Sequence, residues 1–231
     1  MIREARAFSP FPSPAGEFHT FPERLAQEAG AGWAGLTTGF ARLDRALGGL
    51  HGLNILGGTP KAGKSTFAIQ AAADMAGRRL PVIYYDFENG RQKIYLRILS
   101  RLSRLPVEQI RAGNLVGEEA TRLTQGLHTL ETLLPWLRVV NDRKLSPETM
   151  RRHIDFLRHE TRSDYAVVVI DSLHKLPFKD ISQKRSGIDG WLRQLEAIRD
   201  ELAVSFLVIS ELERGPDGQF DGGSAVGDAD G

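Results

Sequence analysis

The sequence contains no cysteine, which excludes a disulfide framework and any zinc site built on thiolates. Long apolar runs are also missing: stretches such as Ala166–Ile170 are far shorter than the ~20 residues that a membrane-spanning helix needs. The net charge is only +1, so overall charge indicates no nucleic-acid partner. Prolines interrupt the N-terminus at Pro10, Pro12 and Pro14, where a signal peptide would have its apolar core. We expect a cytoplasmic protein that does not engage a membrane.

What is present is the composition of an ordinary globular protein, with 41% apolar and 26% charged residues. A length of 231 residues is enough for one well-buried α/β domain. Residues 1–35 differ from the rest, because they hold four prolines and only a short helical candidate at Pro22–Glu28. We expect a proline-rich arm or linker over residues 1–35, either disordered or docked on a neighbouring subunit, and a folded core over residues 36–231.

From Leu36 onward, short apolar segments alternate with longer helical patterns. Strands are expected at Leu53–Leu56, Val82–Phe87, Leu137–Val140, Ala166–Asp171 and Val204–Ser210. Helices are expected at Lys64–Ala76, Arg91–Ser103, Glu118–Leu134, Pro147–Glu160 and Ile188–Leu202. Several strands are apolar at nearly every position, which is typical of parallel strands covered on both faces. The alternation predicts a three-layer α/β domain with a mostly parallel central sheet.

A glycine-rich segment lies between the first expected strand and the first expected helix. It reads Gly58-Thr59-Pro60-Lys61-Ala62-Gly63-Lys64-Ser65, followed by Thr66, and it fits the G-x-x-x-x-G-K-[S/T] pattern of a phosphate-binding P-loop. Glycine lets the backbone curl so that its N–H groups point at an anion, which the following helix N-terminus also attracts. We expect this segment to bind ATP, with Lys64 on the β- and γ-phosphates and Ser65 on Mg²⁺.

Acidic residues stand at the carboxyl ends of three expected strands, where ligands of parallel sheets bind. Asp171 is expected to hold Mg²⁺ together with Ser65, the alternative being a cap on the next turn. Glu88 is nearer the strand end than Asp86, so Glu88 is favoured as the base that polarises the attacking water. The alternative for Glu88 is a solvated strand-end acid, which is what we expect of Asp86. Glu211 is expected either to sense the γ-phosphate or to lie in a solvated loop.

Several short motifs occur in a fixed order along the chain. They are Thr38-Gly39-Phe40 followed by Leu43-Asp44, Phe87-Glu88-Asn89, Ile170-Asp171-Ser172-Leu173, Ser210-Glu211-Leu212-Glu213-Arg214 and Asp228-Ala229-Asp230. Over residues 36–231 this set resembles the C-terminal motor domain of DnaB-type replicative helicases, which are RecA-like ATPases. The resemblance implies a RecA-like fold, with Glu88 as the catalytic base and Asp171 as the Walker B residue. It also implies a hexameric ring that binds ATP between subunits and moves on single-stranded DNA.

By the same resemblance, the segments that face DNA are Pro177–Gly187 and Gly215–Ser224. The first contains Lys179, Lys184 and Arg185. Cations in this position are expected to neutralise DNA phosphates without reading the base sequence. The alternative is an ordinary solvated basic loop.

The sequence departs from the family pattern in three respects. Glu211 stands where the family has glutamine, and a negative charge there is expected to weaken sensing of the γ-phosphate or hydrolysis. A proline-rich arm stands in place of the family's N-terminal helicase domain. The sequence ends at Gly231, before the family's next strand and its arginine finger, so we expect a fragment or a reduced relative whose partner completes the fold.

Three functions are compatible with these residues. The favoured one is an ATP-hydrolysing helicase or translocase motor on single-stranded DNA, with Lys64, Asp171 and Glu88 as catalytic residues. The second is a RecA-type plasmid-replication or recombination ATPase, with which the Pro60-Lys61 pair is also compatible. The third is a nucleotide-binding interaction subunit that joins or regulates a motor ring without turnover, which Glu211 and the end of the sequence at Gly231 favour.

Overall fold

The computed structural model describes residues 18–23, 35–178, 184–214 and 220–221. The chain divides into two units, residues 1–35 and 36–231, and each is described by itself. In the first unit, residues 18–23 form a helix. The remainder of the expected arm, including residues 24–28 of the predicted helix, lies outside the described residues.

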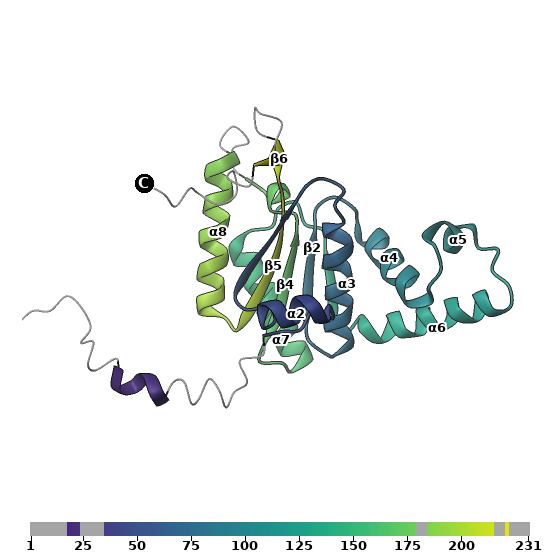
Figure 1. The fold of residues 1–231 in the computed structure, drawn as a ribbon, viewed down its shortest axis with the longest axis horizontal. Coiled ribbons are helices and arrows are strands. Elements are labelled where there is room, and N and C mark those ends of the chain that lie inside the picture. Colours follow the sequence, from purple (N-terminus) through teal and green to yellow (C-terminus); the bar gives the residue numbers. More distant parts are fainter. Residues whose placement is uncertain (1–17, 24–34, 179–183, 215–219, 222–231) are drawn as a thin grey trace, which may run out of the picture. The chain divides into compact units, whose positions relative to one another are not determined.

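The second unit is built on a five-stranded, all-parallel sheet in the order β1-β5-β4-β2-β3 (Figure 1). The strands are β1 (Leu53–Gly58), β2 (Val82–Asp86), β3 (Leu137–Val140), β4 (Ala166–Asp171) and β5 (Val204–Glu211). All residues of β2 and β4 are buried, which explains why their sequences are almost continuously apolar. The predicted α/β class and parallel sheet are therefore confirmed, with strand bounds within two residues of those expected.

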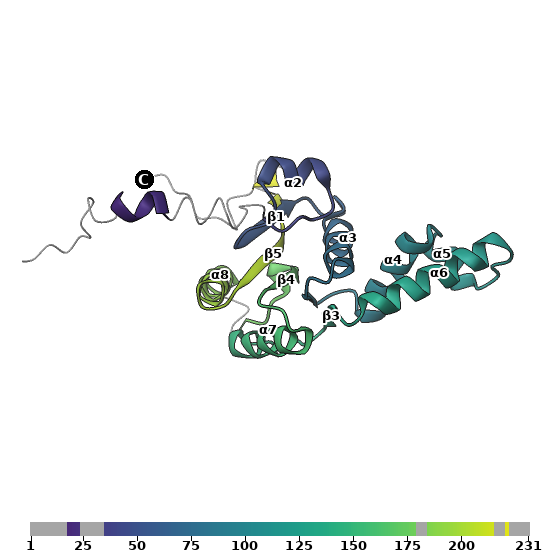
Figure 2. The same ribbon diagram turned by 90° about the horizontal axis from the view of Figure 1, so that it is seen from below.

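Helices cover both faces of this sheet (Figure 2). The helices of the second unit are α2 (Ala41–Leu47), α3 (Lys64–Gly77), α4 (Arg91–Ser103), α5 (Val107–Ala112), α6 (Glu118–Leu133), α7 (Pro147–Thr161) and α8 (Lys184–Glu201). On one face, α3 packs its buried alanines against the strands. On the other face, α7 and α8 pack larger apolar side chains against them, such as Ile154 and Leu195. Two separate apolar clusters result, one on each face, as a three-layer domain requires.

Some elements were not expected from the sequence. The pattern missed α2 and α5, because each spans only six or seven residues and contributes no buried residue that would mark an apolar face. The predicted start of α8 was four residues late, because Gly187 and Gly190 have low helix propensity and lie in its first two turns. Lys184 and Arg185, expected in a loop, therefore begin a helix. A short 3-10 turn, η1 (Leu173–Lys175), follows β4, and β6 (Glu213–Arg214) pairs antiparallel with β7 (Phe220–Asp221).

The turn that leads into α2 is closed by one carboxylate. Asp44 accepts hydrogen bonds from the backbone N–H and the hydroxyl of Thr38, both at 2.7 Å, and from the Gly39 N–H at 3.2 Å. The Phe40 ring then packs on Phe67 of α3, with ring centroids 4.7 Å apart. The segment before β1 is thus held against the helix that follows the P-loop. Among the described helices, none combines the length and apolar character needed to cross a bilayer.

Candidate nucleotide-binding site

The loop between β1 and α3 curls over the carboxyl end of the sheet. Lys61 and Gly63 have positive φ angles, 63° and 90°, and the Ala62 N–H donates to the Thr59 carbonyl at 3.2 Å. Successive turns of this kind direct backbone N–H groups toward one point, which favours an anion there. The N-terminal end of the 14-residue helix α3 adds its positive partial charge at the same place.

The Lys64 ammonium group lies within this loop. Its Nζ donates to the carbonyl oxygens of Gly58 and Thr59, both at 2.7 Å, and the residue is 9% exposed. A Cβ at Gly58 would stand 3.3 Å from the Lys64 side chain, so glycine leaves the room that the lysine occupies. An ammonium group has three N–H donors, and two are engaged by the loop. The third is available to a phosphate oxygen.

A cavity of about 200 Å³ opens beside the loop. From the loop and α3 it is lined by Lys61, Gly63, Lys64, Ser65 and Thr66, and from the strand ends by Glu88, Asp171 and Glu211. Gly58, Thr59, Pro60 and Ala62 belong to the described loop but do not line this cavity. Stretches that lie far apart in the sequence therefore supply two ammonium groups, two hydroxyls and three carboxylates to one place, and α4 adds the guanidinium group of Arg97.

Asp171 is the carboxylate that pairs with the Ser65 hydroxyl. It is 6% exposed, and it accepts hydrogen bonds from the Tyr84 hydroxyl, at 2.8 Å, and from the Ser65 hydroxyl. Burial raises the pKa of Asp171, while these two hydrogen bonds act in the opposite direction. A carboxylate next to a hydroxyl offers the hard oxygen donors that Mg²⁺ prefers, so the pair fits that ion.

The expectation that Asp86 is a solvated acid was wrong. Asp86 is fully buried, and its carboxylate accepts from the Asn89 backbone N–H at 3.0 Å, the Asn89 amide at 3.2 Å and the Gly90 N–H. These bonds close the turn between β2 and α4. The same turn leaves Glu88 exposed at the cavity, whereas Asp86 does not line it.

Glu211 is the last residue of β5 and the register partner of Gly58 on β1. It therefore lies at the base of the P-loop, half-buried, and not in the solvated loop that was the alternative. His174, in the 3-10 turn after Asp171, contacts the Glu211 carbonyl with Nε2 at 3.0 Å and the Ser210 hydroxyl at 3.3 Å. The turn after β4 is thus connected to the end of β5.

Sequence reasoning overlooked Arg97, an exposed residue of α4 that also lines the cavity. Burial and the nearby Asp171 raise the pKa of Tyr84, and the positive charge of Arg97 acts in the opposite direction with a smaller effect. One signal was available in the sequence. Helix α4 begins shortly after the acid Glu88, so its first turns pass the same edge of the sheet. Arg97 lies on the second of these turns.

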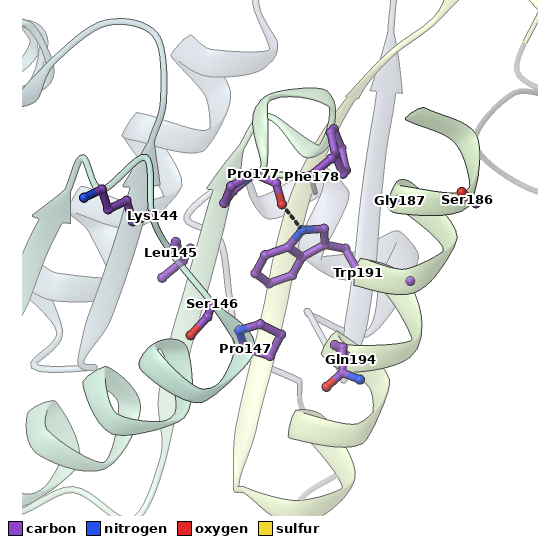
Figure 3. A pocket seen from close by; sticks show the side chains of 11 residues that line it. Lys144, Leu145, Ser146, Pro147, Pro177, Phe178, Ser186, Gly187, Trp191 and Gln194 are labelled. Atoms are coloured by element: carbon purple, nitrogen blue, oxygen red, sulfur yellow. Dashed lines mark hydrogen bonds between the residues drawn. The ribbon is translucent and has the colours of Figure 1, made fainter. Parts of the chain in front are cut away.

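The residues expected to face DNA are described only in part. Lys179 lies outside the described residues, as do residues 215–219 and 222–224, while Lys184 and Arg185 begin α8. Both ends of the Pro177–Gly187 segment line another cavity, of about 480 Å³, beside Trp191 (Figure 3). The Trp191 indole N–H donates to the Pro177 carbonyl at 2.9 Å (Figure 3). This hydrogen bond fixes one end of the segment on α8.

A family model for the DnaB-like helicase C-terminal domain matches residues 35–227. The chain belongs to this family. Replicative DNA helicase DnaB of Leifsonia xyli subsp. xyli is 29% identical over 206 residues, which cover 84% of this DnaB-like chain and 42% of the relative. DnaB of Buchnera aphidicola subsp. Baizongia pistaciae is 27% identical over 198 residues, 83% of the chain and 42% of the relative. The chain thus spans less than half the length of these relatives.

Solved structures share the fold of this DnaB-like domain. One of them, an ATPase domain, superposes with a TM-score of 0.78 at 19% identity, covering 94% of this chain and 78% of that one. A DnaB-like replicative helicase, solved in a study of its interactions with primase, gives 0.79 at 20% identity over 95% of this chain and 54% of that one. The predicted RecA-like architecture and the predicted family are both confirmed.

Proposed function

We propose that this DnaB-like domain binds ATP with Mg²⁺ in the cavity beside the P-loop and hydrolyses it to drive movement along single-stranded DNA. One observation carries the proposal. A single cavity gathers the Lys64 ammonium group, the hydrogen-bonded pair of Ser65 and Asp171, and the exposed Glu88 carboxylate. These are the groups that phosphoryl transfer needs for charge neutralisation, metal binding and activation of water.

Each group has a defined task in this proposal. The curled backbone of Gly58–Thr66 and the N-terminus of α3 bind the phosphates, and the free N–H of Lys64 donates to their oxygens. Ser65 and Asp171 hold Mg²⁺, which when bound neutralises charge on the phosphates. Glu88 accepts a proton from the water whose oxygen attacks the γ-phosphorus, as the bond to ADP breaks.

Two opposite charges flank the position of the γ-phosphate. Arg97 attracts the phosphate, while the Glu211 carboxylate repels it, so the end of β5 responds to whether the γ-phosphate is present. The contact between His174 and the Glu211 carbonyl passes this response to η1, which leads to the Pro177–Gly187 segment. Glu211 thereby acts as the γ-phosphate sensor.

The DNA and the assembly belong to the same proposal. Lys179, Lys184 and Arg185 neutralise phosphates of single-stranded DNA. A cavity of about 200 Å³ is small for a ligand pocket, which usually spans ~300–1,000 Å³, so it accommodates phosphates better than a whole nucleotide. The rest of the nucleotide would then be covered by a neighbouring copy of the chain in a hexameric ring. We expect this ring to act in the cytoplasm. The names of the relatives, replicative DNA helicases, support this assignment.

One feature favours a second candidate, a nucleotide-binding interaction subunit without turnover. Glu211 adds a third carboxylate to a cavity that must accept a highly charged anion. Repulsion of this kind weakens binding of the γ-phosphate and would slow ATP hydrolysis. Nucleotide binding would then control the interaction with a partner protein instead of driving movement.

Steady-state ATP hydrolysis, with and without single-stranded DNA, separates these functions. The parent is expected to hydrolyse ATP faster with DNA, and Glu88→Gln to lose about 10²–10⁴-fold, the usual contribution of a general base. Asp155→Asn, on the exposed surface of α7, is the matched control and should retain turnover. Turnover in Glu88→Gln equal to the parent removes Glu88 from the mechanism. ATP binding without turnover in the parent favours the interaction subunit.

A further inference from the structure

Tyr84 is a fully buried residue of β2 whose hydroxyl reaches the neighbouring strand β4. It donates to Asp171 Oδ2 at 2.8 Å. The register pairs Tyr84 with Val169 and Asp86 with Asp171, so Tyr84 and Asp171 lie two residues apart along the sheet and on the same face. The Tyr84 ring belongs to the apolar cluster under α3, which fixes its position.

The two hydroxyl groups that donate hydrogen bonds to the Asp171 carboxylate lie in different surroundings. Ser65 lines the cavity beside the P-loop, so its hydroxyl is accessible to a metal ion or a ligand. Tyr84 is not one of the described residues that line the cavity, so its bond to Oδ2 comes from the packed interior. A carboxylate otherwise rotates about its terminal bond, and a partner on the interior side selects one orientation.

We propose that Tyr84 is a positioning residue that orients the Asp171 carboxylate for Mg²⁺ binding. The inference rests on the proposed function, because it requires Asp171 to hold the ion. Tyr84 touches neither the nucleotide nor the ion in this arrangement and acts only through Asp171. Its ring provides packing, while its hydroxyl provides the orientation, so the two contributions can be separated by removing a single oxygen atom.

Tyr84→Phe removes this oxygen and leaves the ring in the core. Tyr85→Phe is a matched control, because Tyr85 is the next residue of β2, is also fully buried, and also loses a hydrogen-bonded hydroxyl. The Tyr85 hydroxyl pairs with His153 Nδ1 of α7 at 3.0 Å, on the opposite face of the sheet. Any general effect of losing a buried hydroxyl therefore occurs in both variants. The hydrogen bond to Asp171 is lost only in Tyr84→Phe.

The test is a Mg²⁺ titration of the binding of a fluorescent N-methylanthraniloyl analogue of ATP to the whole chain. For Tyr84→Phe, the Mg²⁺ concentration at half-maximal binding should rise about tenfold, as for other partners of metal ligands. Binding in EDTA should not change, and Tyr85→Phe should match the parent in both conditions. Equal midpoints in Tyr84→Phe and the parent, or equal shifts in the two tyrosine variants, would overturn the inference.

Asp171→Asn distinguishes failure of this inference from failure of the proposed function. If binding to the parent does not depend on Mg²⁺, or if Asp171→Asn leaves the dependence intact, the proposed metal site fails and Tyr84 fails with it. If only the asparagine variant shifts the midpoint, the metal site stands and Tyr84 has no part in it. Adding Tyr84→Phe to Asp171→Asn should cause no further shift, because Tyr84 acts through that carboxylate. Additive shifts would contradict the inference.

Discussion

Asp86 and Asp171 are register partners at the ends of β2 and β4, yet only Asp171 lines the nucleotide cavity. Asp86 directs its carboxylate to the N–H groups of Asn89 and Gly90 and is fully buried. The turn that it closes exposes Glu88 at the cavity. Two acids at equivalent strand positions therefore differ in role because of the backbone that follows each of them.

This difference leads to a prediction for stability. Asp86→Ala should lower the free energy of unfolding by about 1–3 kcal/mol, because the part-buried N–H groups of Asn89 and Gly90 lose their acceptor. Glu88→Ala removes an exposed carboxylate, and its effect should stay within about 0.5 kcal/mol. Urea unfolding followed by circular dichroism measures both. Equal losses in the two variants would show that Asp86 does not close the turn.

Arg97 should contribute to nucleotide binding, because it lines the cavity in which we propose that the phosphates bind. Arg97→Gln is expected to weaken ATP binding about tenfold, the usual cost of one charge-assisted hydrogen bond. Arg111→Gln, on the exposed surface of α5, is the control and should bind as the parent does. Equilibrium binding of ATP with Mg²⁺ decides the matter. An unchanged affinity in Arg97→Gln would place that side chain outside the site.

His153 should make the stability of the core depend on pH. Burial lowers the pKa of His153 below its ordinary value of about 6.5, and the neutral ring pairs with the Tyr85 hydroxyl. The unfolded chain binds the proton more readily than the folded one. The stabilisation is therefore present above pH ~6.5 and is lost as the pH falls through the lower, folded-state pKa.

The measurement is thermal unfolding of the parent and His153→Gln between pH 7.5 and 5. The melting temperature of the parent should fall further on acidification than that of His153→Gln. His128→Gln, at an exposed position of α6, should retain the pH dependence of the parent. Parallel curves for all three proteins would contradict the assignment.

The packing of Gly187 in α8 leads to a prediction for the segment expected to face DNA. A Cβ at Gly187 would lie 2.5 Å from the Phe178 ring, whereas a Cβ at Gly190 would meet nothing within 4 Å. Gly187→Ala should therefore displace Phe178 and lower the melting temperature, while Gly190→Ala should raise it slightly through helix propensity. If the segment contacts DNA, Gly187→Ala should also weaken binding of a single-stranded oligonucleotide. A melting temperature raised equally by both alanines would contradict this packing.

Much of the fold was predictable because local signals agreed with the tertiary structure. The P-loop motif lay between a strand and a helix, and buried parallel strands such as β2 and β4 are apolar almost throughout. Ser146 and Pro147 marked the start of α7, where the serine hydroxyl accepts from the Thr149 N–H. Signals of this kind depend on neighbours in the sequence and need no knowledge of the sheet order.

The features that escaped prediction depend on distant residues. The contact between Tyr84 and Asp171 requires β2 and β4 to be adjacent, although 87 positions separate the two residues in the sequence. The Asp86 carboxylate hydrogen-bonds to nearby Asn89 and Gly90, but its full burial depends on the neighbouring strand β4, which the sequence does not place beside it. Arg97 carries no motif, and its place on the second turn of α4 does not by itself show that α4 leaves the sheet beside the cavity.

The central claim is that the P-loop cavity binds ATP with Mg²⁺ through Lys64, and calorimetric titration tests it most directly. The parent should give a saturable heat with millimolar ATP and Mg²⁺, and Lys64→Ala should lose it. Lys93→Ala, an exposed lysine of α4, should retain the heat of the parent. The absence of a saturable heat in the parent, or an undiminished heat in Lys64→Ala, would contradict the account.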